Sequence, residues 1–176
     1  MANRNKAKGT AWESAVRDFL NQRLGLLNDA GVFADPFSAL NIRRPAQEGA
    51  ADVGDVWAVP FVLECKDVAS PAVPTFLRQA RVEAMHAGYP YGVAVLKTRG
   101  KGTAFGRVCF DVPTWTRARL MLNLNSREMC GSYGFTLSTR GLDTGRWYFT
   151  VRLSDFARLL VDLRAAFGFT TFGYFL

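Results

Sequence analysis

Two carboxylates and a lysine in the middle of the chain have types and spacing that could do chemistry together. If residues 53–58 and 61–68 form antiparallel strands that turn near Val59–Pro60, Asp55 lies opposite Glu64. Opposed side chains in such a pair have Cβ atoms about 4.5–5.5 Å apart. Carboxylates about 5 Å apart repel by roughly 3 kcal/mol at an effective dielectric constant near 20. Either one of them is therefore protonated or a cation lies between them.

A hard divalent cation would suit this pair. Mg²⁺ takes one or two carboxylates together with water and phosphate oxygens, and Mn²⁺ prefers the same ligands. Such an ion activates a bound water and stabilises charge on a phosphodiester, and Lys66 could orient that water and neutralise developing charge. The alternative is that Asp55, Glu64 and Lys66 are ordinary polar residues on a solvated strand face, because three common residues recur at this spacing by chance.

Strand alternation separates the polar and apolar residues of this segment. It places Glu64 and Lys66 on one face, and Phe61, Leu63 and Cys65 on the other. Cys65 is therefore expected to be a small buried hydrophobic residue rather than a nucleophile.

Two further acidic residues have alternative interpretations. Asp52 is a rival to Asp55 as the first carboxylate, but only Asp55 has the register that opposes the second one. Glu13 lies in a predicted helix, where it could form a capping box with Thr10 or pair with Arg17 one turn later.

The composition favours a polyanionic partner. The chain has 22 Lys+Arg against 15 Asp+Glu, a formal charge of +7, and 17 of the cations are arginine, which suits bidentate contacts to phosphate. A membrane surface is the other partner that charge alone allows. The cations that flank the predicted strands are candidate phosphate contacts, with a dispersed solubilising surface as the alternative: Arg43, Arg44, Lys97, Arg99, Lys101 and Arg107.

Other classes of site are excluded by counts. A single histidine, His86, excludes sites that need two, and Cys65, Cys109 and Cys130 are too far apart for a structural zinc site. These unpaired cysteines and the lack of an apolar leader predict a reducing, cytoplasmic setting. No apolar run approaches the length of a membrane span.

The predicted elements form one mixed α/β domain over residues 1–176. Helices are expected from Thr10 to Asn28 after a basic arm at 1–9, from Pro74 to His86, and from Ser154, as N-cap, to Phe167. Strands are expected at 40–45, 53–59, 61–68, 91–97, 107–112 and 147–153.

Three further segments have more than one interpretation. Residues 111–146 are an insertion of uncertain structure, with a short helix near its start and turns or hairpins after it. The tail 167–176 is unusually aromatic. On the second helix, Gln79, Glu83 and His86 share one face, which is either a solvated stripe or, at Gln79, part of the site.

An ordered set of segments resembles the PD-(D/E)XK nuclease superfamily: GTAWE in the first helix, RRP before a GD strand, ECK on the next strand, and then RQARVEAMHAGYPYGVAVLK. Within it, the chain is most similar to the Holliday junction resolvases of archaeal type and their relatives in actinobacterial phages. The resemblance covers residues 6–103, with a weaker echo at 147–165. It implies a restriction-endonuclease-like mixed β-sheet flanked by helices, and a Mg²⁺-dependent endonuclease acting on branched or double-stranded DNA.

The resemblance also implies roles for single residues. Asp55 and Glu64 would bind the metal with the Cys65 carbonyl as a further candidate ligand, Lys66 would be the catalytic lysine, and Glu13 would contribute to the metal site. It further suggests that Gln79 contacts phosphate or water. The sequence departs from the family at two places: Ser14 stands where archaeal members usually have arginine, and 111–146 has no counterpart.

Resolving a junction with two symmetric cuts requires two active sites, so a homodimer is expected. The aromatic tail could supply the interface or pack on its own core. The competing functions are a nuclease of the same fold acting on flaps, ends or restriction sites, a non-catalytic DNA-binding module, and a structural protein.

Overall fold

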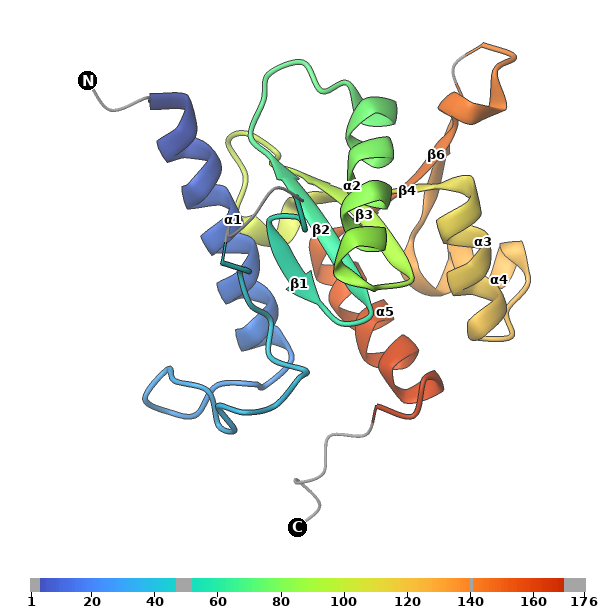
Figure 1. Cartoon of the computed structure of the whole chain (residues 1–176). Coiled ribbons are helices and arrows are strands. Elements are labelled where there is room, and N and C mark those ends of the chain that lie inside the picture. The colour runs from blue at the N-terminus through green and yellow to red at the C-terminus, as the bar shows by residue number, and fades with distance from the viewer. Residues whose placement is uncertain (1–3, 47–51, 140, 170–176) are drawn as a thin grey trace.

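The computed structural model describes residues 4–46, 52–139 and 141–169. It is an α/β protein with a six-stranded mixed sheet in the order β1-β2-β3-β4-β6-β5 (Figure 1). The mixed α/β class predicted from the order of elements is therefore confirmed. The strands are β1 (Val56–Ala58), β2 (Phe61–Lys66), β3 (Tyr91–Leu96), β4 (Arg107–Asp111), β5 (Thr136–Ser138) and β6 (Tyr148–Arg152). The helices are α1 (Arg4–Arg23), α2 (Val73–Ala87), α3 (Val112–Met121), α4 (Ser126–Tyr133) and α5 (Leu153–Ala166).

The β1–β2 hairpin has the register that the sequence predicts. Val56 pairs with Leu63 in an antiparallel ladder, and the Asp55 amide donates to the Leu63 carbonyl at 3.3 Å. Continuing this register by one residue places Asp55 beside Glu64. β2 and β3 are parallel and joined by α2, whereas the other described strand pairs are antiparallel.

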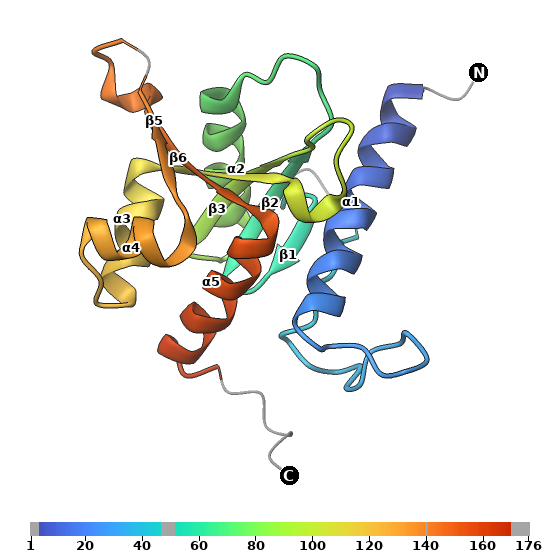
Figure 2. The ribbon, with the colours of Figure 1, turned by 180° about the vertical axis from the view of Figure 1, so that it is seen from behind.

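Helices cover the two faces of the sheet unequally. α2 packs on one face over a small cluster, and α1, α3, α4 and α5 enclose the larger core on the other (Figures 1 and 2). Glu64 alternates with Leu63 and Cys65 of the large core, so its side chain lies on the α2 face. The close approach of α2 requires Gly92, because a Cβ there would lie 2.1 Å from the Ala80 carbonyl oxygen.

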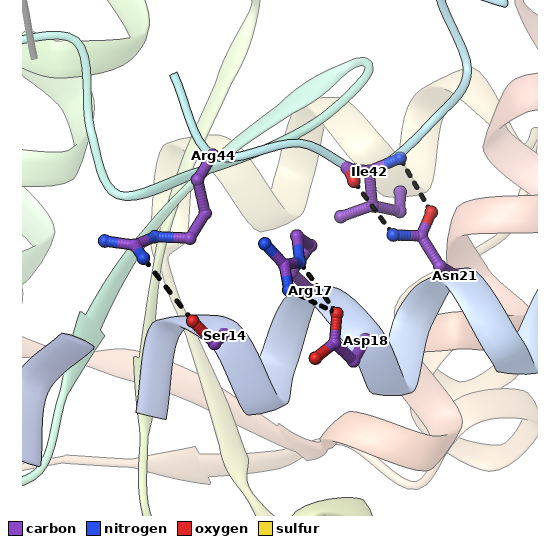
Figure 3. Close-up of polar contacts among 6 residues, drawn as sticks. All are labelled: Ser14, Arg17, Asp18, Asn21, Ile42 and Arg44. Carbon is purple, nitrogen blue, oxygen red and sulfur yellow. Dashed lines mark hydrogen bonds and ion pairs between the residues drawn. The ribbon is translucent and has the colours of Figure 1, made fainter. Parts of the chain in front are cut away.

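Helix α1 is tied to the rest of the fold at two points. The Trp12 indole donates to the Val95 carbonyl at 3.0 Å. The buried amide of Asn21 donates to the Ile42 carbonyl at 2.9 Å and accepts from the Ile42 amide at 3.0 Å (Figure 3). This double contact fixes the segment that leads to Arg43 and Arg44 against α1.

The N-terminal half differs from prediction in three ways. The basic arm at 1–9 is wrong for residues 4–9, which belong to α1, while residues 1–3 lie outside the described ranges. α1 ends at Arg23 rather than Asn28, because Gly25 takes a left-handed conformation with φ 65°. The expected strand at 40–45 is reduced to one antiparallel bridge between Arg43 and Trp57.

The short helix expected near the start of residues 111–146 is confirmed as α3, whereas the turns or hairpins expected directly after it are wrong for residues 126–133, which form α4. Asp111 caps α3 by accepting from the Thr114 amide at 2.7 Å, and Asn125 forms a capping box with Glu128 at the start of α4. The segment then supplies the edge strand β5 and core side chains that pack beneath the sheet: Trp115, Met129, Tyr133 and Phe135.

The C-terminal helix begins one residue before the expected N-cap. Arg152 occupies that position without a side-chain hydrogen bond, so the prediction of a Ser154 cap is wrong. The first part of the tail packs on its own chain, with the Phe167 and Tyr91 ring centroids 6.0 Å apart. Residues 170–176 lie outside the described part of the chain. None of the helices within that part has the length and apolarity needed to cross a membrane.

Candidate active site

A cleft of about 520 Å³ opens between α1, the end of β2 and the loop that follows it. Six of the predicted site residues line it: Glu13, Arg44, Asp55, Cys65, Lys66 and Arg99. Lys8 and Asp67 also line the cleft and were not singled out from the sequence. Glu64 lies behind this lining, where it is 1% exposed. The structure therefore brings residues from α1, the 41–46 segment, the β1–β2 hairpin and the β3–β4 loop to one place.

Gly54 and the Cys65 amide position Asp55. Gly54 has φ 86°, and a Cβ at this position would lie 2.2 Å from a methyl group of Val62, so only glycine fits. The next residue, Asp55, directs its Oδ2 atom to the Cys65 amide, which donates to it at 2.8 Å. This bond fixes the carboxylate against the end of β2. Asp52 instead is exposed and accepts from the Gly54 amide at 3.1 Å, outside the cleft.

Glu64 and Lys66 form an ion pair on the α2 face of β2. Burial, followed by the negative charge of Asp55, raises the pKa of Glu64 to about 9. Burial lowers the pKa of Lys66, but the hydrogen bond and charge of Glu64 outweigh it, so the net pKa of Lys66 is raised. The buried carboxyl therefore retains a proton or needs a nearby cation, which excludes the solvated strand face for Glu64.

Glu13 points into the cleft and pairs with Arg44. The same guanidinium lies 3.4 Å from the Ser14 hydroxyl (Figure 3). Burial, then the charge of Asp55, raises the pKa of Glu13, and Arg44 opposes this shift. Both local interpretations of Glu13 are wrong, because Thr10 lies inside α1 rather than at its start and Arg17 pairs with Asp18.

Asp67 is a residue of the cleft that sequence reasoning missed. Its carboxylate lies 3.0 Å from the Lys97 ammonium and 3.5 Å from the Arg99 guanidinium. The hydrogen bond from Lys97 is the main reason that the pKa of Asp67 is lowered. Lys97 and Arg99, which the sequence indicates as candidate phosphate contacts, are each paired with this carboxylate. Asp67 follows the ECK segment directly, which is the only signal that could have pointed to it.

The remaining predicted DNA-binding residues lie away from the cleft. Arg43 donates to the Pro36 carbonyl and places its guanidinium 5.2 Å from the centre of the Phe33 ring. Lys101 is exposed on the turn after Arg99, and Gln79 is exposed on α2. None of these three side chains lines the cleft.

Glu83 on α2 is unusual because its carboxyl is buried. It is 1% exposed, and neither carboxyl oxygen has a hydrogen-bond partner among the described residues. Its Oε2 lies 3.3 Å from where a Gly54 Cβ would be, so it packs behind the turn that carries Asp55. Burial and then the charge of Asp52 raise the pKa of Glu83 to about 7. A solvated stripe is therefore wrong for Glu83, although Gln79 and His86 are exposed.

The donor atoms near Asp55 suit a hard cation. Two carboxylates and the Cys65 carbonyl are oxygen ligands, and Mg²⁺ commonly uses one or two carboxylates with water and phosphate oxygens completing its shell. Within the ranges that the structure describes, no group of three or more His, Cys, Asp or Glu side chains is placed to hold an ion. An ion beside Asp55 would therefore need water and substrate oxygens to complete its shell.

Comparisons with known proteins found no significant match: no family model, curated protein or solved structure matches the chain.

Proposed function

We propose that this protein is a metal-dependent DNA endonuclease with a restriction-endonuclease-like fold, and that it resolves branched DNA, with Holliday junctions as the expected substrate. One observation carries the proposal. Asp55 and Glu64 lie side by side at the end of a hairpin, with Lys66 paired to the buried carboxyl and a cleft rimmed by cations above them. A carboxyl whose pKa is raised by burial and then by a neighbouring carboxylate is the arrangement that a cation relieves.

The side chains have separate roles in this proposal. Asp55 and Glu64, with the Cys65 carbonyl, would hold Mg²⁺ or Mn²⁺, which supplies an activated water and charge stabilisation at the phosphate. Lys66 orients the attacking water and neutralises charge that develops on the phosphorus oxygens. Glu13 is held by Arg44 at the cleft wall, and Lys8, Arg44 and Arg99 are the further lining cations that would contact a scissile phosphate.

Cleavage of matched substrates tests the proposal. A four-way junction and a linear duplex of the same sequence are incubated with Mg²⁺, with Mn²⁺ and with a chelator. We expect paired, symmetric cuts in the junction with either metal and none after chelation. Equal cleavage of the linear duplex would indicate the same fold acting on another DNA target. Absence of cleavage with every metal would exclude the enzyme.

A non-catalytic DNA-binding module is the second candidate. It is favoured by the lack of three converging metal-binding side chains in the described ranges, and by Lys66 already occupying a pairing position on Glu64. Such a module would bind branched DNA without cutting it under any metal condition, and Asp55→Asn would leave its binding unchanged. The buried, mutually repelling carboxylates argue against it, because binding alone does not need them.

A homodimer is part of the proposal, because two symmetric cuts need two sites. The tail remains the candidate interface, although Phe167 packs against Tyr91 of its own chain. Measuring the mass in solution of the full chain and of a form lacking residues 168–176 tests this. If the truncated form is still a dimer, the tail is not the interface. If the full-length protein is a monomer that resolves junctions, the symmetry argument fails. A cytoplasmic location likewise stays a proposal.

A further inference from the structure

A second groove lies on the other side of the loop that borders the candidate active site. Its volume is about 790 Å³, and it runs between the start of α2, β4 and the short turn before β6. Ala69 lines both the groove and the cleft, so the two are contiguous. Three arginines and one aspartate are the charged residues of its lining: Arg78, Arg107, Arg146 and Asp143. We call this surface the arginine groove.

The arginines of the groove have no ion-pair partner among the described residues. In the described part of the chain no carboxylate lies within ion-pair distance of Arg78, Arg107 or Arg146. Within the described ranges, Arg78 donates only to the Thr75 hydroxyl one turn away, at 3.2 Å. Asp143 accepts from the Gly145 amide at 3.0 Å and is therefore directed to its own turn.

A like-charge pair at the rim of the groove points to an anion. Arg107 on β4 lies directly opposite Arg152 on β6, and both side chains are exposed on the α2 face. Like charges directly opposite in a sheet are destabilising. Arg152 leans to the Phe105 ring, with its guanidinium 5.7 Å from the ring centre, while Arg107 faces the groove. A bound anion would offset this repulsion, whereas no described carboxylate does.

The first turn of α2 adds a further preference for negative charge. Residues 72–75 line the groove, and the N-cap position, Ala72, has no side chain that could cap the helix. The positive end of a 15-residue helix therefore opens toward the arginines. Unpaired arginines, the like-charge pair and this helix end all favour a row of phosphates over an isolated acidic side chain.

We infer that the arginine groove binds the sugar-phosphate backbone of a DNA arm that continues from the active-site cleft across Ala69. The inference rests on the proposed function and adds the path of the substrate. The scissile phosphate lies over Asp55 and Lys66, and the backbone beyond it follows Arg78, Arg107 and Arg146. The groove supplies contacts to phosphate and not to bases, so it strengthens binding without reading sequence.

The test compares two double variants with the same loss of charge. Arg107→Gln with Arg146→Gln removes two groove cations that have no ion-pair partner in the described residues. Arg23→Gln with Arg127→Gln removes two exposed arginines from the end of α1 and from α4, outside the groove. Binding of a four-way junction is followed by fluorescence anisotropy between about 50 and 200 mM salt. Each lost phosphate contact should lower the slope of log affinity against log salt by about 0.9.

We expect the groove variant to lower that slope by about 1.8 and the control variant to leave it unchanged. Thermal unfolding checks that the groove variant is folded, and relief of the Arg107–Arg152 repulsion should leave it at least as stable as the native protein. If the two variants have equal slopes and the native protein cleaves junctions, the proposal for the groove is wrong and the proposed nuclease function stands. A native protein that neither binds nor cleaves DNA would overturn both proposals.

Discussion

The active-site cleft and the arginine groove are neighbouring basic surfaces that differ in how many of their cations are paired with carboxylates. In the cleft, Arg44 is paired with Glu13, Arg99 with Asp67 and Lys66 with Glu64, so that Lys8 is the one lining cation without an ion pair among the described residues. In the groove, three arginines have no carboxylate partner among the described residues. The two surfaces meet at Ala69.

Paired and unpaired cations have different uses: a paired cation is held in position, and an unpaired cation attracts anions more strongly. A cation held by a carboxylate has a fixed direction, which suits chemistry that needs groups placed to within a fraction of an ångström. The same pairing weakens its pull on a phosphate, because part of its charge is already neutralised. An unpaired arginine is freer to move but releases more energy when it meets an anion. Under the proposed function, the cleft would therefore carry the chemistry and the groove would supply affinity for DNA.

Removing the chemistry of the cleft is expected to give the largest effect. Asp55→Asn, Glu64→Gln and Lys66→Ala should each lower the rate of junction cleavage by about 10²–10³-fold or more, because each removes a charge that acts in the transition state. DNA affinity should stay close to native, since the groove is untouched. Single-turnover cleavage and anisotropy measure the two effects separately.

Two control substitutions accompany these variants. Asp29→Asn changes an exposed acidic residue in the loop after α1, and Arg127→Ala changes an exposed arginine on α4, outside the cleft. Both should cleave at the native rate. If any of the three cleft variants also cleaves at that rate, the assignment of the site is wrong.

The electrostatic cost of the carboxylates near the cleft should appear as pH-dependent stability. Burial raises the pKa of Glu83 from its ordinary value of 4.5 to about 7. The folded state then binds the proton more tightly than the unfolded chain, so the free energy of unfolding falls as the pH rises from about 4.5 to about 7. Glu83→Gln cannot ionise. It should match the native protein near pH 5 and exceed it by about 1–3 kcal/mol at pH 8.

Urea denaturation at the two pH values measures this difference. Asp29→Asn is the control, because Asp29 is exposed and should leave the pH dependence as it is in the native protein. The arginine groove contains no buried carboxylate, so Arg146→Gln should leave it unchanged as well. A Glu83→Gln protein that is less stable than native at pH 8 would show that the carboxylate has a stabilising partner.

Local patterns in the sequence predicted much of this architecture. The continuous apolar run at 91–96 forms β3, and the stripe that begins near Pro74 forms α2, which ends at Gly88 in a left-handed conformation. The hairpin register followed from the spacing of Asp55 and Glu64, because two strands joined by a tight turn leave little choice of pairing. A strand interpretation with alternating faces also placed Cys65 in the core correctly.

The errors came from interactions between distant segments and from one overlooked signal. The pairs Arg44–Glu13 and Lys97–Asp67 join residues about thirty positions apart, which no local spacing reveals. The capping box at Asn125 and Glu128, in contrast, was visible and marks the start of α4, yet that segment was predicted as turns.

The smallest expected effect concerns Asp67, and it probes the pairing itself. The lowered pKa of Asp67 keeps its carboxylate charged at neutral pH, where it holds Lys97 and Arg99. Asp67→Asn should release both cations to DNA and steepen the slope of log affinity against log salt by about 0.9 for each new phosphate contact. Asp143→Asn in the groove should leave the slope nearly unchanged, because Asp143 forms no ion pair in the described residues. Anisotropy titrations of both variants measure these slopes. Equal changes in slope would mean that the cations of the cleft and of the groove are equally available to DNA, and the contrast between the two surfaces would be wrong.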